Sequence, residues 1–180
     1  MIPTRSQCLL LFDKFELPSL KRVHVEAVTN LAKTLANKLK SKNAKLKINL
    51  ELLEAACLLH DIDKNIPPKK GERHPDSVVR VLNELGFSKV AQVIKKHPLH
   101  AILDPELMPQ TWEEKLLYLA DKMVKYEVIG VEYRFKLWYK ENLPRAAGTQ
   151  LDASYPKVKA LEKEIFDLIG EKPDSFITGK

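Results

Sequence analysis

The stretch AACLLHDIDK at residues 55–64 decides how the rest of the chain is interpreted. An apolar run with helical spacing ends in His60 and Asp61, side by side, and a loop with two prolines and a glycine follows at 65–73. Such a loop cannot continue a helix, so the helix is predicted to end close to this pair. A histidine and a carboxylate at the end of a buried helix can bind a metal ion or act as general acid and base. Because a His-Asp pair also occurs by chance, the other helices must supply the context that gives it a function.

The composition is typical of a single globular domain. The 180 residues are 44% hydrophobic and 30% charged. No apolar run approaches the roughly 18 residues of a membrane span, and none forms a signal peptide. From the length and composition we expect one domain, residues 1–180. Cys8 and Cys57 are too few for a disulfide framework, so we expect the protein in the reducing environment of the cytoplasm. The net charge of +6 permits an anionic partner, but nucleic acid is not expected because zinc-finger spacing and RNA-binding signatures are absent from the sequence.

The hydrophobic pattern predicts an all-α protein of about seven or eight helices. No segment shows sustained alternation of apolar and polar residues, whereas stripes with helical spacing recur between cap and stop signals. These signals predict helices at residues 4–16, 19–42, 49–60, 75–85, 88–96 and 111–124, and another from about 130. Residues 144–154 are predicted to form a loop. A C-terminal helix at 155–170 is expected to pack on a core of about residues 15–145.

Three polar residues interrupt the apolar stripes of three different predicted helices: His24, His60 and Asp121. A single buried histidine is usually a hydrogen-bonded core residue, but an unpaired carboxylate in an apolar setting is costly. Together with Asp61, the three are most simply explained by a divalent cation, which compensates carboxylates and binds neutral imidazoles. Mn, Fe, Co, Ni, Zn and Mg are all compatible with this ligand set, whereas a structural zinc site is not expected without cysteine ligands.

The order of these residues resembles the H…HD…D pattern of the HD-domain metal-dependent phosphohydrolase superfamily. AACLLHDIDK is similar to the family's LLHDIGK motif, and EKLLYLADKM at 114–123 is similar to its KiLyaADkl motif. The resemblance covers about residues 15–145 and implies an all-α HD fold with four metal ligands: His24, His60, Asp61 and Asp121. Where the family motif has glycine, this chain has Asp63, which adds a negative charge and either alters the turn or hydrogen-bonds water near the metal.

Further histidines resemble those of the two-metal members of the superfamily, such as the HD-type diadenosine tetraphosphate hydrolases. The segments HPDSVVRVLNELG (74–86) and VIKKHPLH (93–100) carry this likeness. It implies that His74 and His97 bind a second ion and that Asp61 bridges the two ions. Alternatively, His74 is only a helix-cap residue and His97 only a helix-end residue, and neither binds a metal ion. His100 falls in a predicted loop and is not expected to be a ligand.

Basic residues close to the pattern are candidates for binding a substrate phosphate. Lys64 matches the lysine of the family motif and is the leading candidate, the alternative being a solvated surface lysine. Arg73 and Arg134 are weaker candidates, because arginine in an amphipathic helix is usually only solvated.

The resemblance implies a metal-dependent phosphohydrolase that cleaves a phosphate ester or phosphoanhydride of a nucleotide or other small phosphorylated metabolite with a metal-activated water. Asp61 and Lys64 would be its catalytic residues, and one or two divalent ions its cofactor. Two alternatives stay open: a di-iron oxygenase of the same fold, and a module that binds nucleotide or RNA without turnover. An aromatic run in the helix that follows residue 130 is either core or the surface of a homodimer: Tyr133, Phe135, Trp138 and Tyr139.

Overall fold

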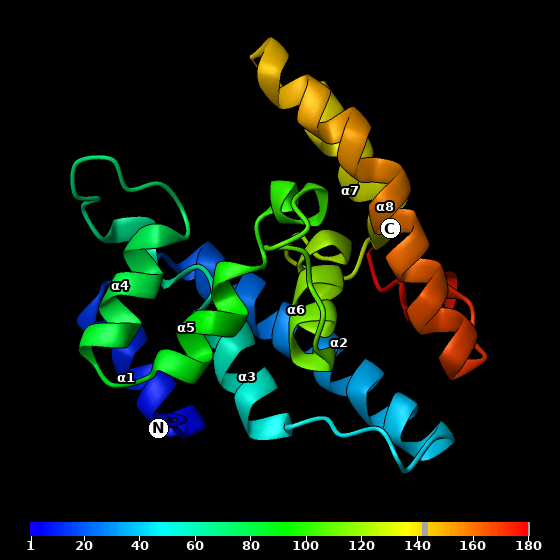
Figure 1. The fold of residues 1–180 in the computed structure, drawn as a ribbon, viewed down its shortest axis with the longest axis horizontal. Helices are drawn as coiled ribbons and strands as arrows, with labels where there is room; N and C mark the ends of the chain where they lie inside the picture. The colour runs from blue at the N-terminus through cyan, green and yellow to red at the C-terminus, as the bar shows by residue number, and fades with distance from the viewer. Residues whose placement is uncertain (142–143, 180) are drawn as a thin grey trace.

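The computed structural model describes residues 1–141 and 144–179, which form eight α-helices, three short 3-10 helices and no strand beyond one isolated bridge (Figure 1). The α-helices are α1 (Arg5–Lys14), α2 (Ser19–Lys42), α3 (Leu50–Leu59), α4 (Asp76–Glu84), α5 (Ser88–Lys95), α6 (Trp112–Met123), α7 (Gly130–Lys140) and α8 (Arg145–Ile169). The 3-10 helices are η1 (Ile62–Asn65), η2 (Leu99–Leu103) and η3 (Pro173–Phe176). The prediction of an all-α fold with seven or eight helices is confirmed. Among these helices, none combines the length and the apolar character that crossing a membrane requires.

α2 is the helix around which the others pack. It lies against α3, α6 and α8, while α7 and α8 run side by side and project from the bundle in Figure 1. Its apolar stripe is buried from Val25 to Leu39, and His24 lies at the start of the same buried face. The packing of this stripe therefore carries His24 to the place where α3 and α6 meet α2.

Side-chain caps fix the starts of the two other helices that supply the site. Asn49 accepts a hydrogen bond from a backbone N–H in the first turn of α3, and Thr111 forms a capping box with Glu114 at the start of α6, as predicted. Each cap satisfies backbone donors that the helix leaves free, so it defines where the helix begins. α2 and α5 begin at Ser19 and Ser88, the first residues of the predicted helices, and no side chain makes a capping hydrogen bond at either start.

The predicted loop at 144–154 is wrong, because these residues belong to the first turns of α8. Pro156 lies inside that helix, where its ring removes one backbone hydrogen bond. Packing on α7 compensates for this loss. Tyr155 meets the ring of Phe135 with centroids 5.0 Å apart, and Leu151 is buried. The sequence around Pro156 favours a loop locally, and only the contact with α7 makes it helical.

The aromatic run of α7 is divided between core and surface. Phe135 is fully buried, whereas about half of Tyr133 and of Tyr139 is exposed, at 49% and 50%, and Trp138 is half-buried. Phe135 therefore belongs to the core, and the homodimer surface stays a prediction.

Both cysteines are expected to resist thiol reagents in the native protein. Cys8 and Cys57 are fully buried, and burial raises the pKa of the Cys8 thiol to about 12 and that of Cys57 well above its ordinary value. Since the thiolate is the reactive species, a chromogenic disulfide reagent at neutral pH should label neither cysteine in buffer and both in denaturant. The exposed variant Ser175→Cys is the positive control. Rapid labelling of two thiols per native chain would contradict this burial.

Candidate metal centre

Three helices bring together the three residues that interrupt their apolar stripes. His24 lies early in α2, His60 is the C-cap of α3, and Asp121 lies near the end of α6. The Nε2 of His24 is 3.0 Å from Oδ1 of Asp121 and 3.3 Å from Nε2 of His60. The Nε2 of His60 is 3.5 Å from the same Asp121 oxygen. The ligand atoms of the three residues lie within 4.8 Å of one another, so they form one group that could hold a metal ion.

Asp61 belongs to two further groups, which extend the cluster to two more histidines. Ligand atoms of His60, Asp61 and His97 lie within 4.8 Å of one another, and so do those of Asp61, Asp63 and His74. The Nε2 of His74 is 2.9 Å from Nε2 of His97 and 3.6 Å from Oδ1 of Asp61. The four imidazoles thus stand in a row, with neighbouring ring centroids 5.3, 5.1 and 4.8 Å apart. All six predicted ligands lie in this cluster, although Asp61 shares no such group with the residues of α2 and α6. Their role as ligands stays a prediction.

Hydrogen bonds fix the orientation of all four rings. The Nδ1 atoms of His24, His60 and His97 each donate to a backbone carbonyl, at 2.7, 2.8 and 2.6 Å. Nδ1 of His74 lies 2.9 and 3.0 Å from the two carboxylate oxygens of Asp63. Carbonyl and carboxylate oxygens only accept, so in the neutral rings Nδ1 carries the proton and Nε2 carries a lone pair. The sequence predicts that Asp63 alters the turn or hydrogen-bonds water near the metal. In the structure its carboxylate instead accepts a hydrogen bond from the imidazole of His74.

This arrangement of lone pairs fits a bound cation. Nε2 faces Nε2 at 3.3 Å between His24 and His60 and at 2.9 Å between His74 and His97. Two lone pairs at such distances repel each other unless a cation or proton lies close to both. Histidines that bind metals through Nε2 commonly donate Nδ1–H to a carbonyl or carboxylate, as all four rings do here. The donor set therefore fits one or more divalent metal ions.

Both carboxylates of the cluster are ionised. Burial raises the pKa of Asp121, but the positive charge of Lys122 outweighs this effect and holds the pKa well below its ordinary value. Burial likewise raises the pKa of Asp61, and the positive charges beside it, including Lys64 and Lys21, lower it below the ordinary range. Burial is also the main reason that the pKa of His97 is well below its ordinary value, so this imidazole is neutral. The cluster thus offers anionic oxygens and, at His97, a neutral imidazole, the forms in which these groups bind metals.

Two lysines on different elements face the carboxylate of Asp61. Nζ of Lys21 lies 2.8 Å from Oδ2, and Nζ of Lys64 lies 3.0 Å from Oδ1. Lys64, the leading candidate for binding a substrate phosphate, therefore lies beside Asp61, and its role stays a prediction. The one sequence signal for Lys21 is its place in the first turn of α2, where the helix dipole disfavours positive charge and a nearby anion would compensate.

Lys122 connects the two halves of the cluster and is not predicted from the sequence. It is almost fully buried, and its Nζ lies 2.6 Å from Oδ2 of Asp121 while donating to the backbone carbonyl of His97 at 2.5 Å. A lysine beside an aspartate in an amphipathic helix is usually solvated. Only the packing of α6 against α5 and the segment after it buries this side chain.

A cleft of about 320 Å³ opens onto the cluster. Arg134 and His100 line it, and His100 belongs to none of the groups of described residues that could hold a metal. Arg73 is exposed and does not line the cleft. The lining residues are Lys21, His24, Asp61, Lys64, His74, His97, Pro98, Leu99, His100, Asp121, Lys122, Arg134 and Trp138.

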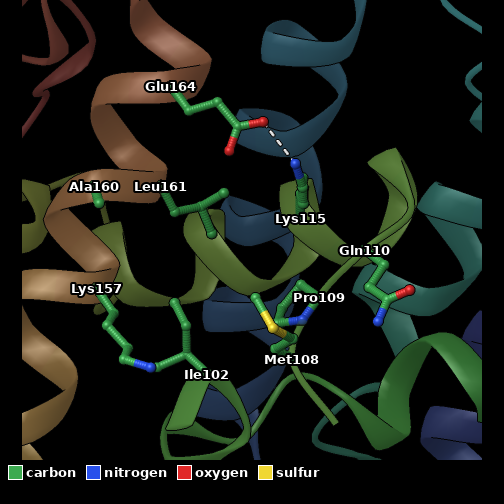
Figure 2. Close-up of a pocket in the computed structure, with 9 residues that line it drawn as sticks. All are labelled: Ile102, Met108, Pro109, Gln110, Lys115, Lys157, Ala160, Leu161 and Glu164. Atoms are coloured by element: carbon green, nitrogen blue, oxygen red, sulfur yellow. Dashed lines mark hydrogen bonds and ion pairs between the residues drawn. The ribbon is translucent and has the colours of Figure 1, made fainter. Parts of the chain in front are cut away.

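A second cavity, of about 560 Å³, lies between α6, α8 and the segment that follows η2 (Figure 2). Its lining is mainly apolar, and its one carboxylate, Glu164, is paired with Lys115 at 2.6 Å. It contains no histidine or aspartate. The chemistry of the side chains therefore places the functional site in the smaller cleft.

Comparison with protein families gives one match, to a family model described as HD domain, over residues 23–125. The match covers more than half of the chain and runs from the residue before His24 to just past Asp121. Comparison with curated proteins and with solved structures gives no match.

Proposed function

This chain belongs to the HD-domain family, and from that membership we propose that it is a metal-dependent phosphohydrolase. Its substrate would be a phosphate ester or phosphoanhydride of a nucleotide or small phosphorylated metabolite. The observation that carries the proposal is the row of four imidazoles whose Nε2 atoms face one another beside two ionised carboxylates. This donor set suits metal-assisted attack of water on phosphorus.

Six residues would hold one or two divalent ions: His24, His60, Asp61, His74, His97 and Asp121. Bound divalent ions supply Lewis acidity at a phosphoryl oxygen and a lowered pKa for a water molecule. The protein itself contributes orientation and charge. The Asp63 carboxylate holds the ring of His74, whose side chain is 31% exposed at the cleft. Lys21 and Lys64 line the cleft beside Asp61 and would compensate negative charge on a phosphoryl group bound there.

Lys64→Gln is expected to lower kcat/KM by about 10- to 100-fold. The Lys64 ammonium lines the cleft and is 30% exposed, so it can turn from Asp61 toward a substrate phosphate, and a charge-assisted hydrogen bond of this kind corresponds to about that loss. Steady-state kinetics on the metal-loaded protein measure it. Lys69→Gln is the matched control, because Lys69 lies in the following loop with 66% of its side chain exposed. Equal kcat/KM in the parent and Lys64→Gln proteins would place Lys64 outside the reaction.

The proposed activity is tested by assaying phosphate release from nucleoside mono-, di- and triphosphates, sugar phosphates and dinucleoside polyphosphates. Each substrate is combined with Mn, Co, Ni, Zn, Mg or ferrous iron added to metal-stripped protein. Release that requires metal and disappears with chelator supports the proposal. Oxygen consumption with iron and no phosphate release would instead identify an oxygenase. Tight nucleotide binding without product under every metal would identify a non-catalytic module.

A further inference from the structure

The cleft carries more positive than negative charge. Its lining residues contain two carboxylates, on Asp61 and Asp121. The same lining contains four cationic side chains: Lys21, Lys64, Lys122 and Arg134. The cationic side chains therefore outnumber the carboxylates, and bound divalent ions would add to this excess of positive charge. A ligand that matches this cleft is an anion.

Arg134 differs from the three lysines because it has no carboxylate partner among the described residues. The lysines lie 2.6–3.0 Å from carboxylate oxygens, whereas the Nε of Arg134 is buried and donates to no atom. Buried donors are nearly always hydrogen-bonded in native proteins, and an exception calls for a partner that is not part of the chain. A guanidinium group that lines a cleft with an unused donor is suited to bind an oxyanion there.

The guanidinium group is held in place by aromatic packing. Its Cζ lies 4.5 Å from the ring centroid of Trp138, one turn later in α7, and Trp138 also lines the cleft. The Trp138 ring packs edge-on against the buried ring of Phe135, at 5.1 Å. This stacking restricts the rotamers of Arg134 before a ligand arrives, which lowers the entropy cost of binding.

The volume of the cleft favours a small molecule as the ligand. About 320 Å³ is at the lower end of the range of small-molecule sites, roughly 300–1,000 Å³. A dinucleoside polyphosphate would need several times the space of a single phosphate with a small substituent. The charge and the volume of the cleft thus favour the same kind of ligand.

We infer, given the proposed function, that the substrate is a phosphate monoester of a small molecule and that Arg134 binds its phosphate. At neutral pH a terminal phosphate carries about −1.5 to −2 charge, whereas a diester carries about −1, so the monoester is attracted more strongly to this cationic cleft. In the reaction, water adds to phosphorus and the bond from phosphorus to the ester oxygen breaks. The released alcohol takes up a proton that the water gives up, and inorganic phosphate is the other product. The planar guanidinium can bind two phosphate oxygens at once.

The kinetic test compares p-nitrophenyl phosphate with bis(p-nitrophenyl) phosphate, which share a leaving group and differ in charge. The monoester should be the better substrate, and Arg134→Gln should raise its KM by about 10- to 100-fold with a smaller change in kcat. Arg134→Lys should recover only part of this loss, because an ammonium lacks the planar fork. Lys136→Gln is the control, since Lys136 is in α7 but is paired with Glu132 outside the cleft. Preference for the diester, or an unchanged KM in Arg134→Gln, would overturn the inference and leave the hydrolase proposal standing.

A binding measurement separates this inference from the proposed activity. Calorimetric titration of inorganic phosphate into the metal-loaded protein should give an affinity about 10- to 100-fold weaker in Arg134→Gln than in the parent and the Lys136→Gln control. Such a difference without phosphate release from any substrate of the panel above would overturn the hydrolase proposal but keep Arg134 as a phosphate-binding residue. Equal phosphate affinity in the parent and Arg134→Gln proteins would show that Arg134 does not bind the phosphate, whatever the kinetic result.

Discussion

Replacing Asp61 with alanine is expected to lower kcat/KM by about 1,000-fold or more and to abolish metal retention at the same time. Asp61 belongs to two of the three groups whose ligand atoms lie within 4.8 Å of one another, and its carboxylate is ionised by its surroundings. A metal ion contributes several kcal/mol to phosphoryl transfer, and about 4 kcal/mol corresponds to 1,000-fold in rate. Steady-state kinetics and elemental analysis of the same purified sample measure both effects.

The fold is expected to survive this substitution. The two partners of Asp61, Lys21 and Lys64, have side chains that are 39% and 30% exposed, so both can be solvated once the carboxylate is gone. Circular dichroism of Asp61→Ala should therefore match the parent protein. Asp174→Ala, at an exposed position in η3, is the control and should retain both activity and metal. Full turnover by Asp61→Ala would exclude this residue from the metal centre.

Adding a metal that the centre binds is expected to raise the melting temperature of the metal-stripped protein by about 10 °C. The cluster exists only in the folded chain, so a ligand at about 1,000 times its dissociation constant adds about 4 kcal/mol to the free energy of unfolding. For a chain of this size, each kcal/mol shifts the midpoint by about 2–4 °C. Differential scanning calorimetry with each candidate metal, and again after chelation, measures the shift and ranks the metals.

Variants identify which residues produce this shift. His60→Ala should lose most of it, because His60 belongs to both the group with Asp121 and the group with His97. His97→Ala should lose only the part due to a second ion. The shift should also shrink below pH 6, since imidazoles must be neutral to bind a metal. An equal shift in the parent and His60→Ala proteins would show that the metal binds elsewhere.

The fold class and the convergence of the site could be predicted because both depend on local periodicity. Helical stripes place His24, His60 and Asp121 on buried faces, and buried faces of packed helices meet. The capping signals at Asn49 and Thr111 mark where two of those helices begin. The family match over residues 23–125 agrees with the H…HD…D resemblance read from these positions.

Features that depend on tertiary packing could not be predicted from the sequence. Residues 144–154 carry weak helix signals and a following proline, and their contact with α7 decides their conformation. The burial of Lys122 and the pairing of Asp63 with His74 join elements that are distant in the chain or separated by an irregular loop. Arg134 has no distinguishing sequence signal, because only the structure reveals its stacking on Trp138 and its unused donor.

The buried ammonium of Lys122 has a consequence for how metal ions would enter the centre. It binds the Asp121 carboxylate on one side and the backbone carbonyl of His97 on the other, so the first group and the row of further histidines share one rigid connection. An ion bound by Asp121 and His60 would therefore act on the His97 segment through Lys122. For a protein that takes two ions, the side chain at position 122 would set how strongly each ion affects the binding of the other.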